Sequence, residues 1–472
     1  MRGWMVALAV AGCHGGSGGT ADDPLPTDQP PTETGTPTDS DTATTPTTAH
    51  TGTTVESGIA LACAPTDNAL RFACHVTVEP PAEVELAFGR SDGTGTVRVH
   101  PGEGVAAEHD IATWFMAPET TYDVEARLLG AAPGSGAVTQ VTTTAPPSAV
   151  SARITVSGTS STPYVGTSLP CTSGVAVAAV FDTTTGEQVW YQVMDGNGTF
   201  GGFNMLQFTE DRTILGQTGD TIVEVTPAGT ELLNKPYTDD FHHDLFRRHG
   251  KTWILFRENV GGVQLDGFVV WDADGNELSR WREADAFTVP VDARGDWSHT
   301  NTVWVDEDES VILSLYTQHT VLRVSPAGEV LWVMDTVGTG GLGNDYVVDW
   351  TAVDGADTFS RQHATTFRPD GRLQMLDNEH GRGLILSLDE VAHTARVDAS
   401  FSAGQSTCGP QGTTVDTAAG HTLVGCSGPA LREYDTGPDP VFSSSLVCDN
   451  GGGGGGGPGP SGSVRWYPLD GW

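Results

Sequence analysis

Three short apolar segments decide the fold that the sequence predicts: Val-Ile-Leu-Ser at residues 311–314, Val-Leu-Arg-Val at 321–324 and Glu-Val-Leu-Trp at 329–332. Their composition is typical of β-strands, and turns containing Gly or Asp separate such strands along the chain. Units of this kind begin near Asn204, His243, His299, His363 and Gln411. A repeat with an irregular period of roughly 40–60 residues predicts a β-propeller with one four-stranded blade per unit.

The two ends of this region predict how the ring closes. A sixth blade can be built from residues 175–194 together with a C-terminal strand at residues 464–467. Joining the first and last segments leaves no open sheet edge. We therefore expect a six-bladed propeller over residues 150–472.

A smaller β domain is predicted before the propeller, over residues 58–147. Short alternating strands occur at residues 70–76 and 83–88, and turn-forming residues separate them. Residues 118–126, which include Tyr122, resemble the strand of fibronectin type III-like sandwiches that carries the tyrosine corner. The described pattern predicts an all-β chain.

The N-terminus has the pattern of an export signal. Arg2 precedes an apolar run at residues 4–11, and Val-Ala-Gly-Cys follows at 10–13. The ending resembles the lipobox of bacterial lipoproteins, so we expect 1–13 to be a lipoprotein signal and Cys13 to carry the lipid. An ordinary signal with a chance cysteine is the alternative. Residues 14–57 are rich in Thr, Pro and Asp and contain no aromatic residue, which predicts a disordered stalk.

The other cysteines and the charge fit a protein outside the cytoplasm, facing the periplasm or the cell surface. Six cysteines remain besides Cys13, and an even count in an exported chain indicates disulfides. Cys63 and Cys74 flank a predicted hairpin and are expected to pair. Among the three connectivities open to Cys171, Cys408, Cys426 and Cys448, the pair Cys408–Cys426 is favoured. The formal net charge of −37 argues against nucleic acid as a partner and against a basic patch that binds anionic membranes. The membrane is therefore expected as a partner through the lipid only.

Histidines recur at the predicted starts of innermost strands. They occur in His242-His243-Asp244, in Asp296-Trp297-Ser298-His299-Thr300-Asn301 and in Arg361-Gln362-His363. Because the blades of a propeller are arranged around one axis, these side chains are expected to converge on a central cavity. Two alternatives remain open: purely structural histidines, and a metal held by His243, His299 and His363 with Asp244 as a carboxylate ligand.

These three motifs, each opening a blade, resemble those of the bacterial aryl-sulfate sulfotransferases over about residues 150–472. That family consists of exported six-bladed propellers that move a sulfuryl group from a phenolic sulfate to a phenol, without a nucleotide donor or another cofactor. The resemblance implies that His363 is the nucleophile and that His299 and His242 or His243 assist it. Neutral imidazole suits this chemistry because its pKa lies near neutral pH. We expect Asp244, Asn301 and Tyr316 to contact the substrate.

One residue departs from the family pattern. Tyr316 stands where the family usually has an arginine, and a phenol cannot supply the bidentate charge of a guanidinium. His319 could replace the arginine in part. Three functions therefore remain open: an arylsulfotransferase, a non-catalytic surface propeller that binds a ligand or partner, and a metal-dependent propeller hydrolase.

Overall fold

The computed structural model describes residues 58–171, 176–194, 203–338, 341–409, 411–426, 428, 430–449 and 465–472. In these ranges the regular structure is β-sheet apart from the four-residue helix α1 (Glu283–Ala286), so the expected all-β class is confirmed. The predicted signal, Cys13 and the predicted stalk lie outside the described residues. Within the described part, no helix is long and apolar enough to cross a membrane.

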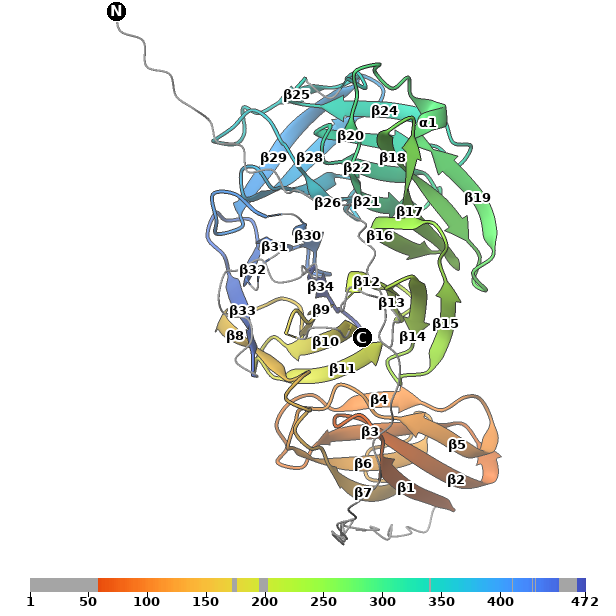
Figure 1. Cartoon of the computed structure of the whole chain (residues 1–472). Helices are drawn as coiled ribbons and strands as arrows, with labels where there is room; N and C mark the ends of the chain where they lie inside the picture. Colours follow the sequence, from red (N-terminus) through yellow and green to blue (C-terminus); the bar gives the residue numbers. More distant parts are fainter. Residues whose placement is uncertain are drawn as a thin grey trace, which may run out of the picture. The chain divides into compact units, whose positions relative to one another are not determined.

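Two antiparallel sheets form a sandwich before the propeller region (Figure 1). One sheet has the order β1 (Ile59–Pro65), β2 (Phe72–Ala82), β5 (Ala106–Ala112), and the other has the order β4 (Arg98–Pro101), β3 (Val84–Arg90), β6 (Thr121–Leu128), β7 (Ala137–Thr142). Alternate residues of both sheets share one apolar core. At the start of β6 the hydroxyl of Tyr122 accepts a hydrogen bond from the backbone N–H of Ala117 at 2.7 Å, five residues upstream.

Six further antiparallel sheets of four or five strands follow. In sheet order they are β11 (Gln188–Met194), β10 (Ala176–Asp182), β9 (Tyr164–Ser168), β34 (Tyr467–Pro468); then β12 (Phe203–Phe208), β13 (Ile214–Thr218), β14 (Thr221–Val225), β15 (Glu231–Pro236); then β16 (Asp240–Arg248), β17 (Lys251–Val260), β18 (Val263–Trp271), β19 (Glu277–Arg282), with β20 (Gly295–Asp296) beside β18. The remaining three are β21 (Thr300–Val305), β22 (Val311–Leu315), β23 (Thr320–Val324), β24 (Val330–Asp335); then β26 (His363–Phe367), β27 (Leu373–Asp377), β28 (Arg382–Asp389), β29 (Thr394–Ser402), β25 (Val347–Asp349); and β30 (Gly412–Asp416), β31 (Thr422–Cys426), β32 (Ala430–Tyr434), β33 (Phe442–Cys448), β8 (Ala152–Gly158).

The six sheets form a closed ring, as Figure 1 shows. The first strands β12, β16, β21, β26 and β30 contact one another in this order, and β9 and β34 contact the two ends of the series. Each sheet packs on both faces, which explains the continuous apolar runs of the sequence. In β22, Val311, Leu313 and Leu315 pack toward residues of β17 and β18, whereas Ile312 packs toward residues of β27. The arrangement is that of a β-propeller.

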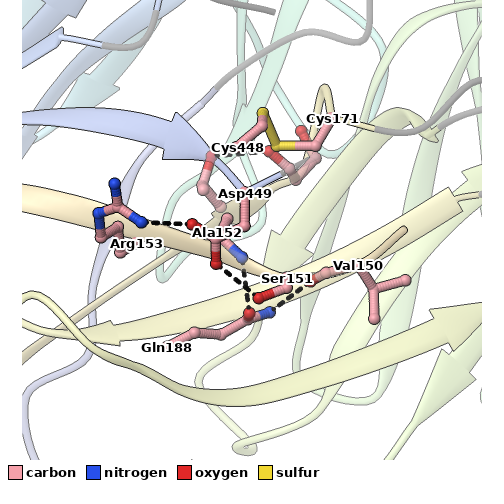
Figure 2. The surroundings of a disulfide bond; sticks show 10 residues. Val150, Ser151, Ala152, Arg153, Cys171, Gln188, Cys448 and Asp449 are labelled. Atoms are coloured by element: carbon pink, nitrogen blue, oxygen red, sulfur yellow. Dashed lines mark hydrogen bonds and ion pairs between the residues drawn. A yellow bond between two sulfur atoms is a disulfide. The ribbon is translucent and has the colours of Figure 1, made fainter. Parts of the chain in front are cut away.

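Both ends of the propeller region take part in closure. The C-terminal β34 pairs with β9 in the first sheet, as expected for residues near 467, and β8 adds a fifth strand to the last sheet. The sequence interpretation had identified neither β8 nor β9. Figure 2 shows the junction, where the Cys171–Cys448 disulfide lies beside Asp449. The Asp449 carboxylate accepts a hydrogen bond from Ser151 Oγ at 2.6 Å and forms an ion pair with Arg153.

Three disulfides are present among the described residues. Cys63–Cys74 joins facing positions of β1 and β2, and Cys408–Cys426 is the pair favoured by the sequence. Cys171–Cys448, which the sequence left open, joins segments that are 277 residues apart. Since disulfides persist in oxidising compartments, the three bonds indicate an extracytoplasmic protein.

We expect removal of the closing disulfide to destabilise the propeller. Replacing Cys171 and Cys448 together by alanine should lower the free energy of unfolding by about 2–5 kcal/mol, because the unfolded chain loses its longest cross-link. The matched control replaces Cys408 and Cys426, which are only 18 residues apart. In the chain-entropy model this shorter loop should lower the free energy of unfolding by roughly 2 kcal/mol less than the loss of Cys171–Cys448. Chemical unfolding followed by tryptophan fluorescence measures both. Equal losses in the two double variants would contradict a role in ring closure.

Candidate functional site

Bulges at the starts of three adjacent inner strands place the histidines. The ladder between β16 and β17 shifts register between Phe241 and Leu245, so residues 242–244 leave the regular pairing. Corresponding shifts occur at the start of β21 and after His363 in β26. A bulge re-aims side chains that strict alternation would send to opposite faces. Both His242 and His243 consequently join the same cluster.

Unusual backbone conformations accumulate at the same place. Six non-glycine residues there have φ between 51° and 68°: His243, His299, His319, Arg361, Ala364 and Gln411. Such left-handed conformations cost of order 1–3 kcal/mol each and tend to occur where surrounding structure holds a functional geometry. The local strain shows that side-chain direction here is set by tertiary packing.

The histidines of three sheets meet in one cluster. Ring centroids are separated by 4.3 Å for His242 and His243, 4.6 Å for His243 and His299, and 4.9 Å for His242 and His299. Tyr316 connects this group to His363, since its ring lies 5.1 Å from that of His299 and 5.5 Å from that of His363. The structure thus brings together all four histidines singled out in the sequence.

His363 has one ring nitrogen committed and one free. Its Nδ1 lies 3.0 Å from Asn378 Oδ1 and 3.1 Å from the carbonyl oxygen of Arg361. The Asn378 amide donates its two hydrogens to the carbonyls of Gly409 and Gln411, which fixes the orientation of its oxygen. Because both neighbours of Nδ1 are acceptors, Nδ1 carries the proton.

The other nitrogen of His363 therefore carries a lone pair. Nε2 is buried and has no hydrogen-bond partner among the described residues. Burial lowers the pKa of His363 to about 3. The imidazole is neutral at pH 7, and its nucleophilic nitrogen is unprotonated.

A hydrogen-bonded chain runs through the other histidines. His299 Nδ1 contacts the carboxylate of Asp296 and must be protonated, so its Nε2 accepts. His243 Nε2 lies 2.7 Å from His299 Nε2 and is the donor of that pair. Gln411 Nε2 donates to the remaining nitrogen of His243 at 3.5 Å. Burial, followed by the neighbouring histidines, holds the pKa of His243 well below its usual value.

The Asp296–His299 pair has the arrangement of a general acid–base unit. The carboxylate orients the imidazole through Nδ1, while Nε2 faces the cluster. Arg257 Nη2 lies 3.1 Å from both oxygens of Asp296 and balances its charge.

His242 is held from both sides. Its Nδ1 lies 2.7 Å from Asp266 Oδ1, and its Nε2 contacts the guanidinium of Arg257. Asp266 in turn donates its backbone N–H to the carboxylate of Glu283, and burial together with the Asp266 charge raises the pKa of Glu283 to about 8. These contacts assign His242 a positioning role.

Tyr316, Arg361 and His319 lie on one side of the cluster. The backbone N–H of Tyr316 donates to the His299 carbonyl at 3.0 Å, which fixes the tyrosine beside the histidine. The Arg361 guanidinium lies 5.9 Å from the centre of the Tyr316 ring. His319 Nδ1 accepts hydrogen bonds from Ser360 Oγ and from the backbone N–H of Arg361, so its Nε2 is a donor.

Two predicted substrate-contacting residues bind protein groups instead of facing the cluster. The buried Asn301 donates to the carbonyl of Gln362 at 2.8 Å. The buried Asp244 accepts from the Arg465 guanidinium at 3.1 Å and from two backbone N–H groups. Asp244 is therefore the partner of a buried arginine, Arg465, whose charge also acts on His363.

The surroundings of the histidine cluster do not suit a metal ion. Ligand atoms of His242, His243 and His299 lie within 4.8 Å of one another. However, Arg257 contacts the Nε2 face of His242, and a guanidinium beside a metal cation is electrostatically unfavourable. The residues present fit an imidazole proton network better than a metal centre.

Sequence reasoning assigned no site role to Arg257, Asp266, Gln411 and Arg465. Asp296 lies in the same motif as His299, three residues before it. That spacing between a carboxylate and a histidine could have indicated the pair from the sequence. Arg257 lies on β17, which pairs with the strand of His242, and is 15 residues from that histidine, so the hairpin brings the two together. Arg465 lies beside β34 and is distant in sequence from His363, and only the folded ring makes these two neighbours.

Comparisons with known proteins bear on this region. Residues 172–394 match the family model described as Arylsulfotransferase (ASST). No curated protein matches the chain.

Several solved structures resemble the chain at low identity. A protein of unknown function from Bacteroides caccae is 13% identical with a TM-score of 0.44, covering 65% of this chain and 100% of that one. A putative 6-phosphogluconolactonase from Bacteroides fragilis is 12% identical with a TM-score of 0.35, covering 75% and 90%. Virginiamycin B lyase from Staphylococcus aureus is 9% identical with a TM-score of 0.35, covering 77% and 99%.

The family match spans the bulged strands that carry His242, His243, His299 and His363. It agrees with the resemblance found in the three histidine motifs and indicates an arylsulfotransferase-like function. Over residues 172–394, this chain therefore contains an arylsulfotransferase (ASST) family domain.

Proposed function

We propose that this protein transfers a sulfuryl group from a phenolic sulfate to a phenol through a covalent sulfohistidine at His363. The observation that carries the proposal is the buried Nε2 of His363, which lacks a hydrogen-bond partner among the described residues while Nδ1 is held as a donor. A neutral imidazole so arranged presents its lone pair without having to lose a proton first.

In the first half-reaction, the Nε2 lone pair forms a bond to sulfur as the bond between sulfur and the phenolic oxygen breaks. The electron pair of the broken bond leaves on the phenolate. His299 enters this step with a proton bound at Nε2, in place of the hydrogen bond that it accepts from His243 in the empty site, and gives that proton to the phenolate. Positive charge develops on the sulfated imidazole. Asn378 Oδ1 and the Arg361 carbonyl, both at Nδ1, support that charge through stronger hydrogen bonds.

In the second half-reaction, the acceptor phenol gives its proton to His299 as its oxygen bonds to sulfur. The nitrogen–sulfur bond breaks and its electron pair returns to Nε2 of His363. Asp296 supports the charged state of His299 in both halves. Each cycle thus restores His363 and His299 to their starting forms.

The sulfuryl oxygens need positive charge, and Arg361 is the group we assign to this task. Its side chain is about half exposed, at 52%, and its carboxylate partner Glu379 is exposed as well. The guanidinium lies next to Tyr316, the position where the sequence lacks the expected arginine. Arg257 is less available, because its nitrogen already bridges both oxygens of Asp296.

We further propose that the protein is exported and anchored by a lipid on Cys13, with phenolic sulfates and phenols as its only small-molecule partners. The three disulfides support export. Intact-mass analysis of the N-terminal peptide from membrane-extracted protein tests the anchor. Acylated Cys13 as the first residue is the expected result, and an unmodified or longer N-terminus would refute the anchor alone.

The enzymatic proposal predicts a trapped intermediate. Purified protein incubated with 4-nitrophenyl sulfate should carry a sulfuryl adduct on the peptide that contains His363, detected by mass spectrometry. Formation of the adduct should release one equivalent of 4-nitrophenol per protein, and any release beyond that equivalent should require an added phenol. The change His363→Ala should abolish the adduct and lower turnover by more than about a thousandfold, since a nucleophile is removed.

The controls separate the alternative functions. His249→Ala removes an exposed histidine that pairs with Glu307 and should leave turnover unchanged, as should a metal chelator. Release that needs no phenol and stops with chelator would replace the proposal by a metal-dependent hydrolase. A protein that forms no adduct and releases nothing under any condition would be a binding module.

The neutral state of His363 predicts a pH dependence of stability. Its pKa is about 3 in the folded protein, whereas an unfolded histidine titrates near 6.5. Between these values the unfolded chain binds the extra proton, so this residue destabilises the fold as the pH falls from about 6.5 toward 3. The contribution reaches about 1.4 kcal/mol for each pH unit.

Urea unfolding at pH 7 and pH 5 measures this effect. Wild-type protein should lose up to about 2 kcal/mol more than His363→Gln over that interval. His249→Gln, at an exposed site, should follow the wild type. An identical pH dependence in all three proteins would mean that His363 is not kept neutral by burial.

A further inference from the structure

A cavity of about 340 Å³ lies among the inner strands, separate from the histidine cluster. Leu245 and Ala364 line it, and they follow His243 and His363 closely in sequence, yet none of the four clustered histidines is part of the lining. Arg465 also lines the cavity and binds Asp244, the residue after His243. The Asp244–Arg465 ion pair therefore lies between the cavity and the cluster.

Aromatic rings make up much of the cavity wall. They come from five different strands: Phe208, Phe246, Trp304, Phe367 and Tyr467. Ring centroids lie 6.2 Å apart for Phe246 and Trp304, 5.7 Å for Trp304 and Phe367, and 5.6 Å for Phe208 and Tyr467. These aromatic side chains pack on one another and come from strands that the propeller holds in place. The aromatic wall therefore exists before any ligand binds. Such a wall favours a flat aromatic ligand.

Several buried polar side chains of the lining are incompletely hydrogen-bonded, among them Gln374, Thr414, Arg465 and Trp466. Gln374 is 2% exposed, its Nε2 donates to Thr366 Oγ1 at 3.0 Å, and its Oε1 has no partner among the described residues. A buried acceptor without a donor costs stability until a ligand or water supplies one. A ligand hydroxyl can donate or accept, so it satisfies either orientation of this amide.

The charged groups of the lining are already paired. Arg465 is paired with Asp244, and Asp416 Oδ1 lies 2.6 Å from Arg368 Nη1. An anionic ligand would find donors at Arg465 Nε and Trp466 Nε1 that have no partner among the described residues, but the charge of Arg465 is already balanced by Asp244 and the chain as a whole carries a formal charge of −37. The cavity therefore favours a neutral molecule over a sulfate ester.

We propose that this cavity is a second binding site that takes neutral phenols, with the ring against the aromatic wall and the hydroxyl at Gln374. The site lies apart from the proposed reaction centre and does not require sulfuryl transfer. Its selectivity for phenol over phenyl sulfate distinguishes it from a centre that must accept both molecules.

Titration calorimetry and ligand-observed NMR test the site in full-length His363→Ala protein, in which no turnover occurs. Phenol, benzene and phenyl sulfate are the probes. Phenol should bind, benzene should bind more weakly and phenyl sulfate should not bind in the cavity. Gln374→Met keeps the volume but removes the amide, and should weaken phenol binding by roughly 3- to 10-fold without changing benzene binding.

A second variant fills the space. Val415→Trp places an indole at a lining residue and should eliminate the phenol and benzene binding that phenyl sulfate does not displace, since binding that it displaces belongs to the reaction centre. Val391→Trp is the matched control at a residue that is 97% exposed, and it should bind like the parent. Phenol binding that phenyl sulfate does not displace and that survives both Gln374→Met and Val415→Trp would overturn the proposal, as would binding of phenyl sulfate that Val415→Trp removes. If the experiment of the previous subsection finds no sulfuryl adduct on His363, the proposed function fails but the binding results expected for this cavity do not change.

Discussion

Closure of the ring is the constraint on which the site depends. His242 and His243 lie on β16 and His299 directly precedes β21 of the next sheet, and rings from the two sheets approach within 5 Å because the inner strands are held around one centre (Figure 1). β34 and β8 close the ring by pairing with strands from the opposite end of the propeller region. The Cys171–Cys448 disulfide and the contacts of Asp449 hold the same junction (Figure 2).

Electrostatics then divide the centre of the ring into two environments. At the histidines, burial keeps His243 and His363 neutral. Beside His299, the negative charge of Asp296 is balanced by the guanidinium of Arg257. Toward the other cavity, the Asp244–Arg465 pair satisfies its own charges. Because the protein is strongly acidic, it repels an anionic sulfate ester over most of its surface. Such an ester can bind favourably only where a cation such as Arg361 remains exposed.

Much of the fold could be read from local patterns. Period-two strands, turn residues and the recurrence of units predicted an all-β propeller, and the even cysteine count predicted disulfides. The prediction did not find β8 and β9, because strands that complete a sheet at the far end of the chain have no local partner. Strict alternation also left open which of His242 and His243 faces inward, and the bulge in β16 directs both to the cluster.

By itself, the sequence determined the repeating strand pattern and the positions of the histidine motifs, because hydrophobic periodicity and residue type are local properties. Only the tertiary structure decided the partners of each ring nitrogen, the pairing of Asp244 with Arg465 and the existence of a separate aromatic cavity. The Asp244–Arg465 pair, for example, joins residues that are 221 positions apart. Such contacts are selected by packing around a closed ring, and that information is not contained in any single segment of the chain.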